Sequence, residues 1–223
     1  MDLQPIDPRN QILKILKPGQ NLMAVSKLQP VEKIKTLANQ GQIHFGENYV
    51  QEALDKIETL RELHLQWHLI GPLQKNKVKY LKNHFSYIHS VDSIALAELL
   101  SAKSVLINHR QKIFIQVNLS AEASKSGFDE TELLKQWAPL KSLPGLEIIG
   151  LMTMPPLENS AENNRVFFRK LKVLGTQLNI NEFSMGTSQD YQVALEEGAT
   201  WIRIGTVLFG DRPKKTETEL RTE

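Results

Sequence analysis

"LMAVSKLQPVEKIKTLANQGQIHFGEN", residues 22–48, contains one full repeat of the pattern that decides the fold. It holds two apolar runs with an amphipathic segment between them, over residues 22–27, 43–47 and 29–40 respectively. In the middle segment, Val31, Ile34 and Leu37 recur at helical spacing and share one face. The stretch therefore predicts a strand, a helix and a second strand, which is the unit from which parallel sheets are built.

The same alternation continues along the rest of the chain. Strands are predicted over residues 22–27, 43–47, 65–71, 86–91, 112–118, 146–153, 182–186 and 201–205. Helices are predicted over residues 29–40, 48–63, 92–107, 128–140 and 160–178, the last with Val166, Phe167, Lys170, Leu171 and Leu174 on its buried face. Eight such units in one chain indicate an α/β protein with a (β/α)8 TIM barrel. An open doubly wound sheet is the alternative, but no G-x-G-x-x-G motif opens a helix.

The ends of the chain add little to this barrel. We expect a single domain over 1–223, with an extra N-terminal helix at Pro5–Leu16 inside segment 1–21. The segment 211–223 is a charged tail. The composition does not change along the 223 residues, and no linker-like stretch divides them.

Composition excludes several classes of protein. The net charge of +2 is too small for nucleic acid to be the main partner, and no apolar stretch reaches the length of a membrane span. The absence of cysteine removes disulfides and thiolate metal sites, and it suits a reducing compartment. The 6 histidines show no metal-like spacing. We therefore expect a cytoplasmic protein without a metal.

Polar side chains gather where the predicted strands end, which is where the active sites of (β/α)8 barrels lie. The motif "SMGTSQD" follows the seventh strand and "RIGT" closes the eighth. Glycine and hydroxyl residues before a helix offer N–H groups to an anion, and barrels often bind phosphate at these two loops. The two motifs predict a phosphate site, although Ser188, Gly186 and Gly205 also suit ordinary caps and turns.

Two cationic side chains flank this site. Lys27 ends the first strand, which adjoins the eighth strand in a closed barrel, and Arg203 shares a strand face with Gly205. A lysine, an arginine and a phosphate site together fit pyridoxal 5′-phosphate, whose aldehyde forms a Schiff base with lysine. A phosphorylated sugar bound by a Schiff-base aldolase fits the lysine and the phosphate site, but gives the arginine no such role. A salt bridge between Arg203 and Glu47 is a further alternative.

The chain resembles a known family over residues 22 to 210. The stretches that match it in order are "LMAVSKLQP", "HFGENYVQEALDKI", "WHLIGPLQKNKVKYL", "IHSVDS", "VNLSAEASKSGF", "GLMTMPP" and "FSMGTSQDYQVALEEGATWIRIGTVLFG". This is the pyridoxal-phosphate homeostasis protein family, also called the YggS or proline synthetase co-transcribed homolog family. The resemblance implies the barrel of the alanine racemase N-terminal domain.

The same resemblance implies the residues of the site. It places pyridoxal 5′-phosphate on Lys27 as a Schiff base and the ring nitrogen near Arg203. It places the phosphate on Ser184, Gly186, Thr187, Gly205 and Thr206, and it places Asn48, His68 and Met152 around the ring. The family usually has methionine at the position of Thr187, whose hydroxyl either joins the phosphate site or changes the packing beside it.

The resemblance also implies a function: a non-catalytic protein that holds the cofactor and takes part in intracellular pyridoxal-phosphate homeostasis and amino-acid and keto-acid balance. The alternative is a small pyridoxal-phosphate-dependent amino-acid racemase. Racemases of this fold take a second acid/base from a further domain, for which the 17 residues after Thr206 are too few. Tyr49 and Tyr191 are nearer, but each fits a core or rim role better. We expect a monomer whose partners include apo pyridoxal-phosphate enzymes.

A few other residues invite interpretation. His68 and His89 stand at strand ends near the expected ligand, whereas His44 fits a surface or core position. The lysine-rich stretch 74–82 fits a solvated helix face better than an anion site. Lys125, in the loop after the fifth strand, is a candidate for transient contact with the aldehyde.

Overall fold

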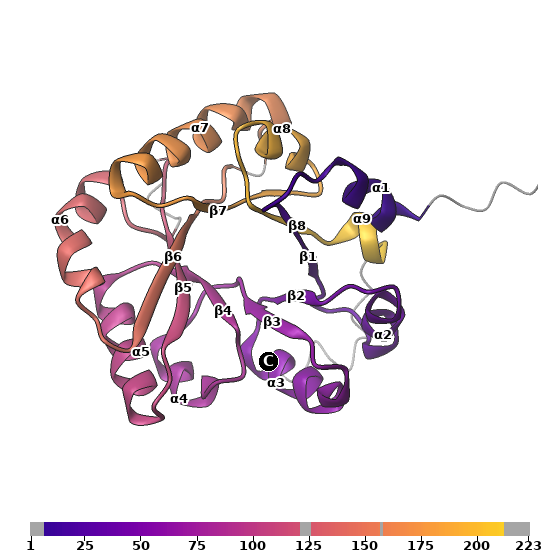
Figure 1. The fold of residues 1–223 in the computed structure, drawn as a ribbon, viewed down its shortest axis with the longest axis horizontal. Helices are drawn as coiled ribbons and strands as arrows, with labels where there is room; N and C mark the ends of the chain where they lie inside the picture. The colour runs from indigo at the N-terminus through magenta and orange to yellow at the C-terminus, as the bar shows by residue number, and fades with distance from the viewer. Residues whose placement is uncertain (1–6, 121–125, 157, 212–223) are drawn as a thin grey trace, which may run out of the picture.

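Eight parallel strands close into a barrel in chain order, and β1 pairs with β8 to complete it (Figure 1). The computed structural model describes residues 7–120, 126–156 and 158–211. The strands are β1 Asn21–Val25, β2 His44–Glu47, β3 Gln66–Leu69, β4 Tyr87–Val91, β5 Gln111–Gln116, β6 Leu146–Met152, β7 Glu182–Thr187 and β8 Trp201–Ile204. The predicted (β/α)8 barrel is confirmed, and the open sheet is excluded because β1 and β8 are hydrogen-bonded neighbours.

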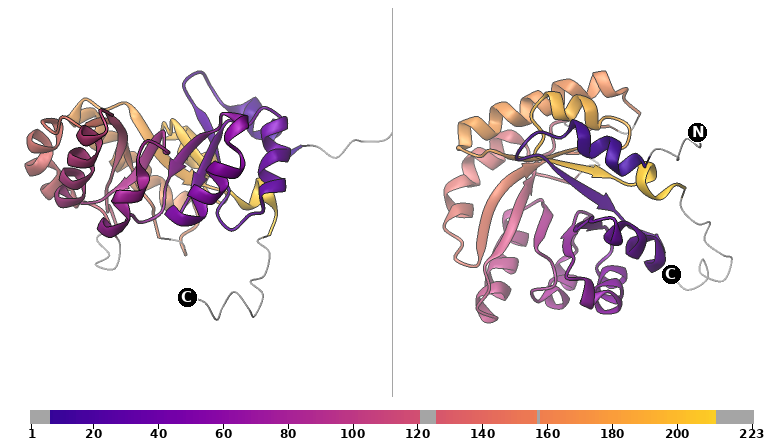
Figure 2. Two further views of the ribbon diagram at one scale, coloured as in Figure 1. Left: turned by 90° about the horizontal axis from the view of Figure 1, so that it is seen from below. Right: turned by 45° about the vertical axis from the view of Figure 1, so that its right-hand side comes forward.

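Helices surround the barrel in a ring (Figures 1 and 2). They are α1 Pro8–Ile15, α2 Val31–Asn39, α3 Val50–Thr59, α4 Val78–Leu81, α5 Ile94–Leu106, α6 Glu130–Lys141, α7 Ala161–Leu178, α8 Tyr191–Glu196 and α9 Thr206–Phe209, with short 3-10 turns at Arg61–Leu63 and Lys75–Lys77. The extra N-terminal helix is present as α1. No helix of the described residues is long and apolar enough to cross a membrane.

Helix starts follow from the capping residues in the sequence. The side chains of Ser93, Asp129 and Ser160 accept hydrogen bonds from backbone N–H groups in the first turns of α5, α6 and α7. Each such bond satisfies a donor that has no partner within its helix. These caps set the lengths of the loops that leave the C-terminal ends of β4, β5 and β6.

Side chains alternate between two apolar layers along each strand. On β8, Ile202 and Ile204 belong to the larger cluster between the strands and the helices. Trp201 joins a smaller cluster with Met23 and Phe114. Because successive strand residues point to opposite faces, the second cluster fills the barrel interior.

Glycines on two strands make room for these interior side chains. A Cβ on Gly46 would lie 2.6 Å from Met23 Sδ, and a Cβ on Gly150 would lie 2.2 Å from the ring of Phe114. Both distances are too short for real atoms, so larger residues at these positions would displace the interior packing.

Some expected boundaries differ from the structure. β1 ends at Val25, so Lys27 lies in the turn after the strand and not on the strand itself. The buried face of α7 carries Asn164, Phe168 and Leu171, whereas Val166 and Lys170, expected on that face, are exposed. Asn164 is buried on that face because it donates to the buried Asp190, in line with the apolar residues that follow it. Segment 211–223 lies outside the described residues beyond Asp211.

Candidate functional site

A cavity of about 250 Å³ opens at the C-terminal ends of the strands. Its wall is formed by Val25, Lys27, Asn48, Ile70, Met154, Thr187, Ser188, Gln189, Arg203, Gly205 and Thr206. These residues come from the ends of β1, β2, β3, β6, β7 and β8 or from the loops that follow them. Among the described residues, Lys27 and Arg203 are the wall's titratable side chains. The cavity is therefore cationic on two sides and otherwise polar or apolar.

The turn that carries Lys27 is held by a buried ionic cluster. We call Ser26, Glu47, Glu52 and Lys56 the Glu47–Lys56 cluster. Lys56 Nζ donates to Glu47 Oε1 at 2.8 Å, to Glu52 Oε1 at 2.6 Å and to the carbonyl oxygen of Ser26 at 2.7 Å. Ser26 Oγ donates to Glu47 Oε1 at 2.6 Å. The cluster ties the residue before Lys27 to β2 and α3.

The residue after Lys27 is tied to the same cluster. Leu28 has a φ of 59°, a left-handed conformation that is costly for a leucine. Its backbone N–H donates to Glu52 Oε1 at 2.6 Å, which stabilises that conformation. The backbone on both sides of Lys27 is thus bound to charged side chains of α3, the buried Lys56 and the partly buried Glu52.

The buried carboxyl of Glu47 has an unusual environment. Glu47 is 0% exposed, and its Oε2 atom has no hydrogen-bond partner among the described residues. Burial raises the pKa of Glu47 to about 7, against the opposing attraction of Lys56. The folded protein therefore holds a proton on Glu47 at pH values where the unfolded chain has released it.

We expect this proton to make stability depend on pH. The pKa of Glu47 is about 7 in the folded chain against 4.5 ordinarily, so its contribution is full below pH 4.5 and is lost as pH rises through 7. The loss amounts to about 3 kcal/mol of unfolding free energy. Urea unfolding of wild type and Glu47→Gln at pH 5 and pH 8 measures it. From pH 5 to pH 8, the free energy of unfolding of the variant should rise relative to that of wild type. The same difference between the two proteins at both pH values would contradict the prediction.

Arg203 reaches the cavity from the barrel interior. It is 4% exposed, and its Nη1 and Nη2 atoms donate to Ser184 Oγ at 2.8 Å and to the carbonyl oxygen of Thr153 at 3.0 Å. Burial lowers the pKa of Arg203 to about 10, opposed by Asp190, so the guanidinium stays charged at neutral pH. The salt bridge to Glu47 is not formed, because Glu47 pairs with Lys56.

The loop after β7 is organised by Asp190, which is 5% exposed. Its Oδ1 atom accepts from the backbone N–H of Thr187 at 2.6 Å and from the Thr187 hydroxyl at 3.0 Å, while Oδ2 accepts from Asn164 at 2.7 Å. The Thr187 hydroxyl thus supports the loop and points to Asp190. Ser188 Oγ accepts from the backbone N–H of Gly205 at 3.2 Å, so the loops after β7 and β8 are joined.

The structure brings most of the predicted site residues together. Lys27, Asn48, Thr187, Arg203, Gly205 and Thr206 line the cavity. Ser184 and Gly186 lie behind the wall, where Ser184 contacts Arg203 and Gly186 has a φ of 89°. His68 and Met152, which were expected around the ring, are buried at 0% and 1% exposure and do not line the cavity. The alternation of strand residues turns both into the barrel interior.

Five further residues complete the wall, namely Val25, Ile70, Met154, Ser188 and Gln189. Ser188 and Gln189 stand in the "SMGTSQD" motif that predicts the phosphate site, whereas Val25, Ile70 and Met154 were not predicted, although each lies at or just after a strand end. Glu52 and Lys56 gave no signal, because charged residues four apart on a helix resemble an ordinary surface pair. Lys125 lies outside the described residues.

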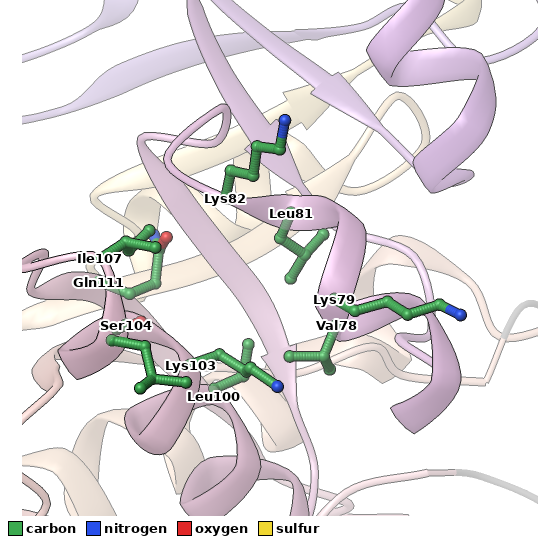
Figure 3. A pocket seen from close by; sticks show the side chains of 10 residues that line it. Val78, Lys79, Leu81, Lys82, Leu100, Lys103, Ser104, Ile107 and Gln111 are labelled. Atoms are coloured by element: carbon green, nitrogen blue, oxygen red, sulfur yellow. The ribbon is translucent and has the colours of Figure 1, made fainter.

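A second cavity, of about 120 Å³, lies between α4 and α5 (Figure 3). Its apolar floor includes Leu81 and Leu100, and the lysines Lys79, Lys82 and Lys103 lie around it. Two of these lysines come from the lysine-rich stretch 74–82, so part of that stretch borders a cavity and part forms a helix face. None of the predicted site residues lines this cavity. The described residues also contain no group of histidine, aspartate and glutamate placed to hold a metal.

Comparison with known proteins defines the class to which this barrel belongs. The sequence model of the alanine racemase N-terminal domain family matches residues 2–213. An alanine racemase of Clostridium difficile 630 shares the fold, with a TM-score of 0.75 at 14% identity, over 95% of this chain and 58% of that one. The protein is thus a barrel of the alanine racemase N-terminal type.

Closer relatives identify the family. The pyridoxal phosphate homeostasis protein of Aquifex aeolicus is 42% identical over 197 residues, which cover 86% of each protein. The structure of PipY from Synechococcus elongatus PCC7942, a COG0325 family member with PLP bound, has a TM-score of 0.86 at 39% identity and covers 91% of this chain and 98% of that one. This chain belongs to the pyridoxal phosphate homeostasis protein family.

Proposed function

We propose that this protein binds pyridoxal 5′-phosphate in the cavity at the C-terminal ends of the strands and holds it as a Schiff base on Lys27. In this role it takes part in intracellular pyridoxal-phosphate homeostasis and in amino-acid and keto-acid balance. The observation that carries the proposal is that Lys27 and Arg203 face one cavity beside the joined loops after β7 and β8. The family, and the PLP bound to PipY, support it.

The residues of the cavity fit the chemical groups of this cofactor. The phosphate needs N–H and hydroxyl donors, and the backbone N–H groups of Thr206 and Val207 precede the first hydrogen bonds of α9, which run from Leu208 and Phe209 to Gly205. Ser188 and Thr206 add hydroxyl groups to the same wall. When bound, the cofactor supplies an aldehyde that condenses with an amine, and a pyridine ring that can withdraw electrons.

Each cationic residue has a distinct part in holding the cofactor. Lys27 would hold the cofactor through its amine, which would condense with the aldehyde and release one water. The Glu47–Lys56 cluster fixes the turn from which Lys27 reaches the cavity. Arg203 has only N–H donors, so it would hold a ring nitrogen as an acceptor and would favour its unprotonated form. An unprotonated ring withdraws electrons weakly, which favours holding the cofactor over carbanion chemistry.

We infer that the protein holds the cofactor without turning over a substrate. Racemisation needs a second acid/base across from the lysine, and the described cavity wall carries no titratable side chain besides Lys27 and Arg203. Tyr49 is 54% exposed, and Tyr191 packs against the main core. The likeness to the homeostasis relative, which is matched over 86% of its length, also supports a holding role. We further propose a cytoplasmic monomer that passes the cofactor to apo pyridoxal-phosphate enzymes.

Binding is tested by adding pyridoxal 5′-phosphate to the purified protein. An absorbance band of a protein imine should appear, and borohydride should fix one cofactor per chain, read as an increase in intact mass. Pyridoxamine 5′-phosphate, which has an amine in place of the aldehyde, serves as the control and should give no fixed adduct. Saturating cofactor that produces neither the band nor the mass increase would refute the proposal.

The racemase alternative is tested by proton exchange at Cα. The loaded protein is incubated with a panel of amino acids in heavy water, and deuterium incorporation is followed by mass spectrometry. We expect no incorporation above that caused by free pyridoxal 5′-phosphate, because the cavity wall lacks a second acid/base. Exchange above this background that disappears in Lys27→Ala would show a catalytic protein.

A further inference from the structure

Three imidazole rings form a hydrogen-bonded row through the barrel interior. His44 Nδ1 lies 3.0 Å from His68 Nε2, and His68 Nδ1 lies 2.9 Å from His89 Nε2. His89 Nδ1 lies 2.8 Å from Ser184 Oγ, which accepts from Arg203 at 2.8 Å. We call His44, His68 and His89 the histidine chain. It starts on the first residue of β2 and reaches the cavity wall at Arg203, so it joins the two ends of the barrel.

Such a row is costly in a barrel core. Interiors of this fold are usually filled by branched apolar side chains, and each buried ring nitrogen needs a partner. Here five of the six ring nitrogens have one within the row. The sixth, Nε2 of His44, is at the end of the row, where the ring is only partly buried. The ring nitrogens inside the barrel are thus all hydrogen-bonded, the last of them to Ser184, which indicates a role beyond filling space.

The charge of Arg203 sets the direction of the row. Arg203 donates to Ser184 Oγ, which leaves the Ser184 hydroxyl proton to be donated to His89 Nδ1. His89 then donates from Nε2 to His68, and His68 donates from Nε2 to His44. Every N–H therefore points away from the guanidinium. The reverse order would turn an N–H of His89 toward that charge and would leave the hydroxyl proton without an acceptor.

We propose that the histidine chain positions Arg203 in the cavity and transmits the protonation of His44, at the opposite end of the barrel, to it. An imidazolium at His44 carries N–H on both ring nitrogens, so its Nδ1 atom no longer accepts from His68. One result is that the hydrogen bond between His44 and His68 is lost. The other is that His68 and His89 each move their proton from Nε2 to Nδ1, so that His89 directs an N–H toward Ser184. Both results weaken the hydrogen bond that Ser184 Oγ accepts from Arg203. The consequence for the cofactor rests on the proposed function.

The surroundings of the chain make His44 its titrating member. Burial lowers the pKa of His44, and it lowers the pKa of His68 and of His89 much further, so the inner two stay neutral. The charged and titratable groups around the row are Glu182 on the indole N–H of Trp201, Lys112 over the ring of Tyr87, Tyr87 stacked on His68, Arg203, and Asp190 near Arg203. Trp201 meets His44 edge-on with centroids 4.9 Å apart.

The test uses full-length protein without cofactor, labelled with ¹⁵N at histidine. NMR of the ring nitrogens at pH 8 should show protonated Nε2 and unprotonated Nδ1 in all three rings. Lowering the pH through the titration of His44 should shift the His89 ring signals together with those of His44. If His89 signals stay fixed while His44 titrates, the coupling is overturned.

Two substitutions at His44 sharpen the test. Asparagine places an amide oxygen near the position of Nδ1 and keeps an acceptor for His68, whereas leucine removes it. His44→Leu should shift the His89 signals at pH 8 and weaken pyridoxal 5′-phosphate binding by roughly three- to tenfold, as expected for one lost buried hydrogen bond. His44→Asn should match wild type at pH 8 and lose the pH response. Equal His89 signals in all three proteins would overturn the proposal.

These readouts separate this proposal from the proposed function. The NMR measurements need no cofactor, so they decide the coupling even if pyridoxal 5′-phosphate does not bind. Thermal unfolding of each variant confirms that it is folded, and if His44→Leu does not fold, the pH titrations of wild type and His44→Asn still give opposite expected results. If the His89 signals shift while the affinity for pyridoxal 5′-phosphate stays the same, the histidine chain couples only residues of the barrel interior. That result would overturn the proposal that the chain positions Arg203.

Discussion

Lys27→Ala should abolish the imine absorbance band and the borohydride-fixed mass increase completely. The described cavity wall offers no other amine, so no second covalent attachment at this site is expected. Lys27→Arg keeps the positive charge but should lose the covalent bond. It should retain weaker, reversible binding through Arg203 and the loops after β7 and β8. Comparing the two variants separates the contribution of the bond from that of the charge.

The control for Lys27→Ala is Lys79→Ala, which removes an exposed amine beside the cavity between α4 and α5. This variant should keep the full absorbance band. Peptide mapping after borohydride should place the adduct on Lys27 and should also show whether Lys125 carries any. An unchanged band in Lys27→Ala, or an adduct chiefly on another lysine, would contradict the assignment of Lys27.

Lys56→Met should lower the free energy of unfolding by about 3–5 kcal/mol, since it leaves a buried carboxylate without its partner. Glu47 is 0% exposed and already has one oxygen without a hydrogen bond, so it has no alternative donor of equal charge. Urea unfolding at pH 8, where Glu47 is ionised, gives the largest effect. Adding Glu47→Gln to Lys56→Met should recover part of the loss.

Arg61→Met is the matched control for Lys56→Met. Arg61 pairs with Glu58 in a bridge whose side chains are 68% and 77% exposed, so its removal should cost under about 1 kcal/mol. Equal effects of the two substitutions would show that burial does not strengthen the Glu47–Lys56 cluster. Lys56→Met should also weaken cofactor binding, because the turn before Lys27 loses a hydrogen bond from Lys56 to the carbonyl of Ser26.

The barrel was predictable from sequence because its strands are short apolar runs at regular intervals, each followed by a loop. The cavity residues Lys27, Thr187 and Arg203 were also predictable, since every parallel strand ends at the same side of the barrel. Lys56 and Glu52 were not, because the charged face of an amphipathic helix looks solvated until the loop that covers it is known.

The histidine chain could not be predicted from the sequence for a related reason. Strand periodicity tells which residues share a side of a strand, but His44, His68 and His89 meet only because three neighbouring strands are in a particular register. That register places Gly46 beside His68 and His68 beside Tyr87. His68 was accordingly expected at the ligand because it stands near a strand end, whereas its side chain is directed into the barrel.

The pairing of β1 with β8 has a consequence for when the site comes into being. β1 and β8 lie side by side although they come from distant parts of the sequence (Figure 2, right). Met23 and Arg203 are partners across this pair and stand 180 residues apart in the chain. A nascent chain cannot assemble the cavity until its last strand has left the ribosome, because Lys27 and Arg203 come from opposite ends of the sequence. A ligand bound by both Lys27 and Arg203 connects β1 to β8. Cofactor binding should therefore protect the amides of β1 and β8 from hydrogen exchange more than those of β4 and β5.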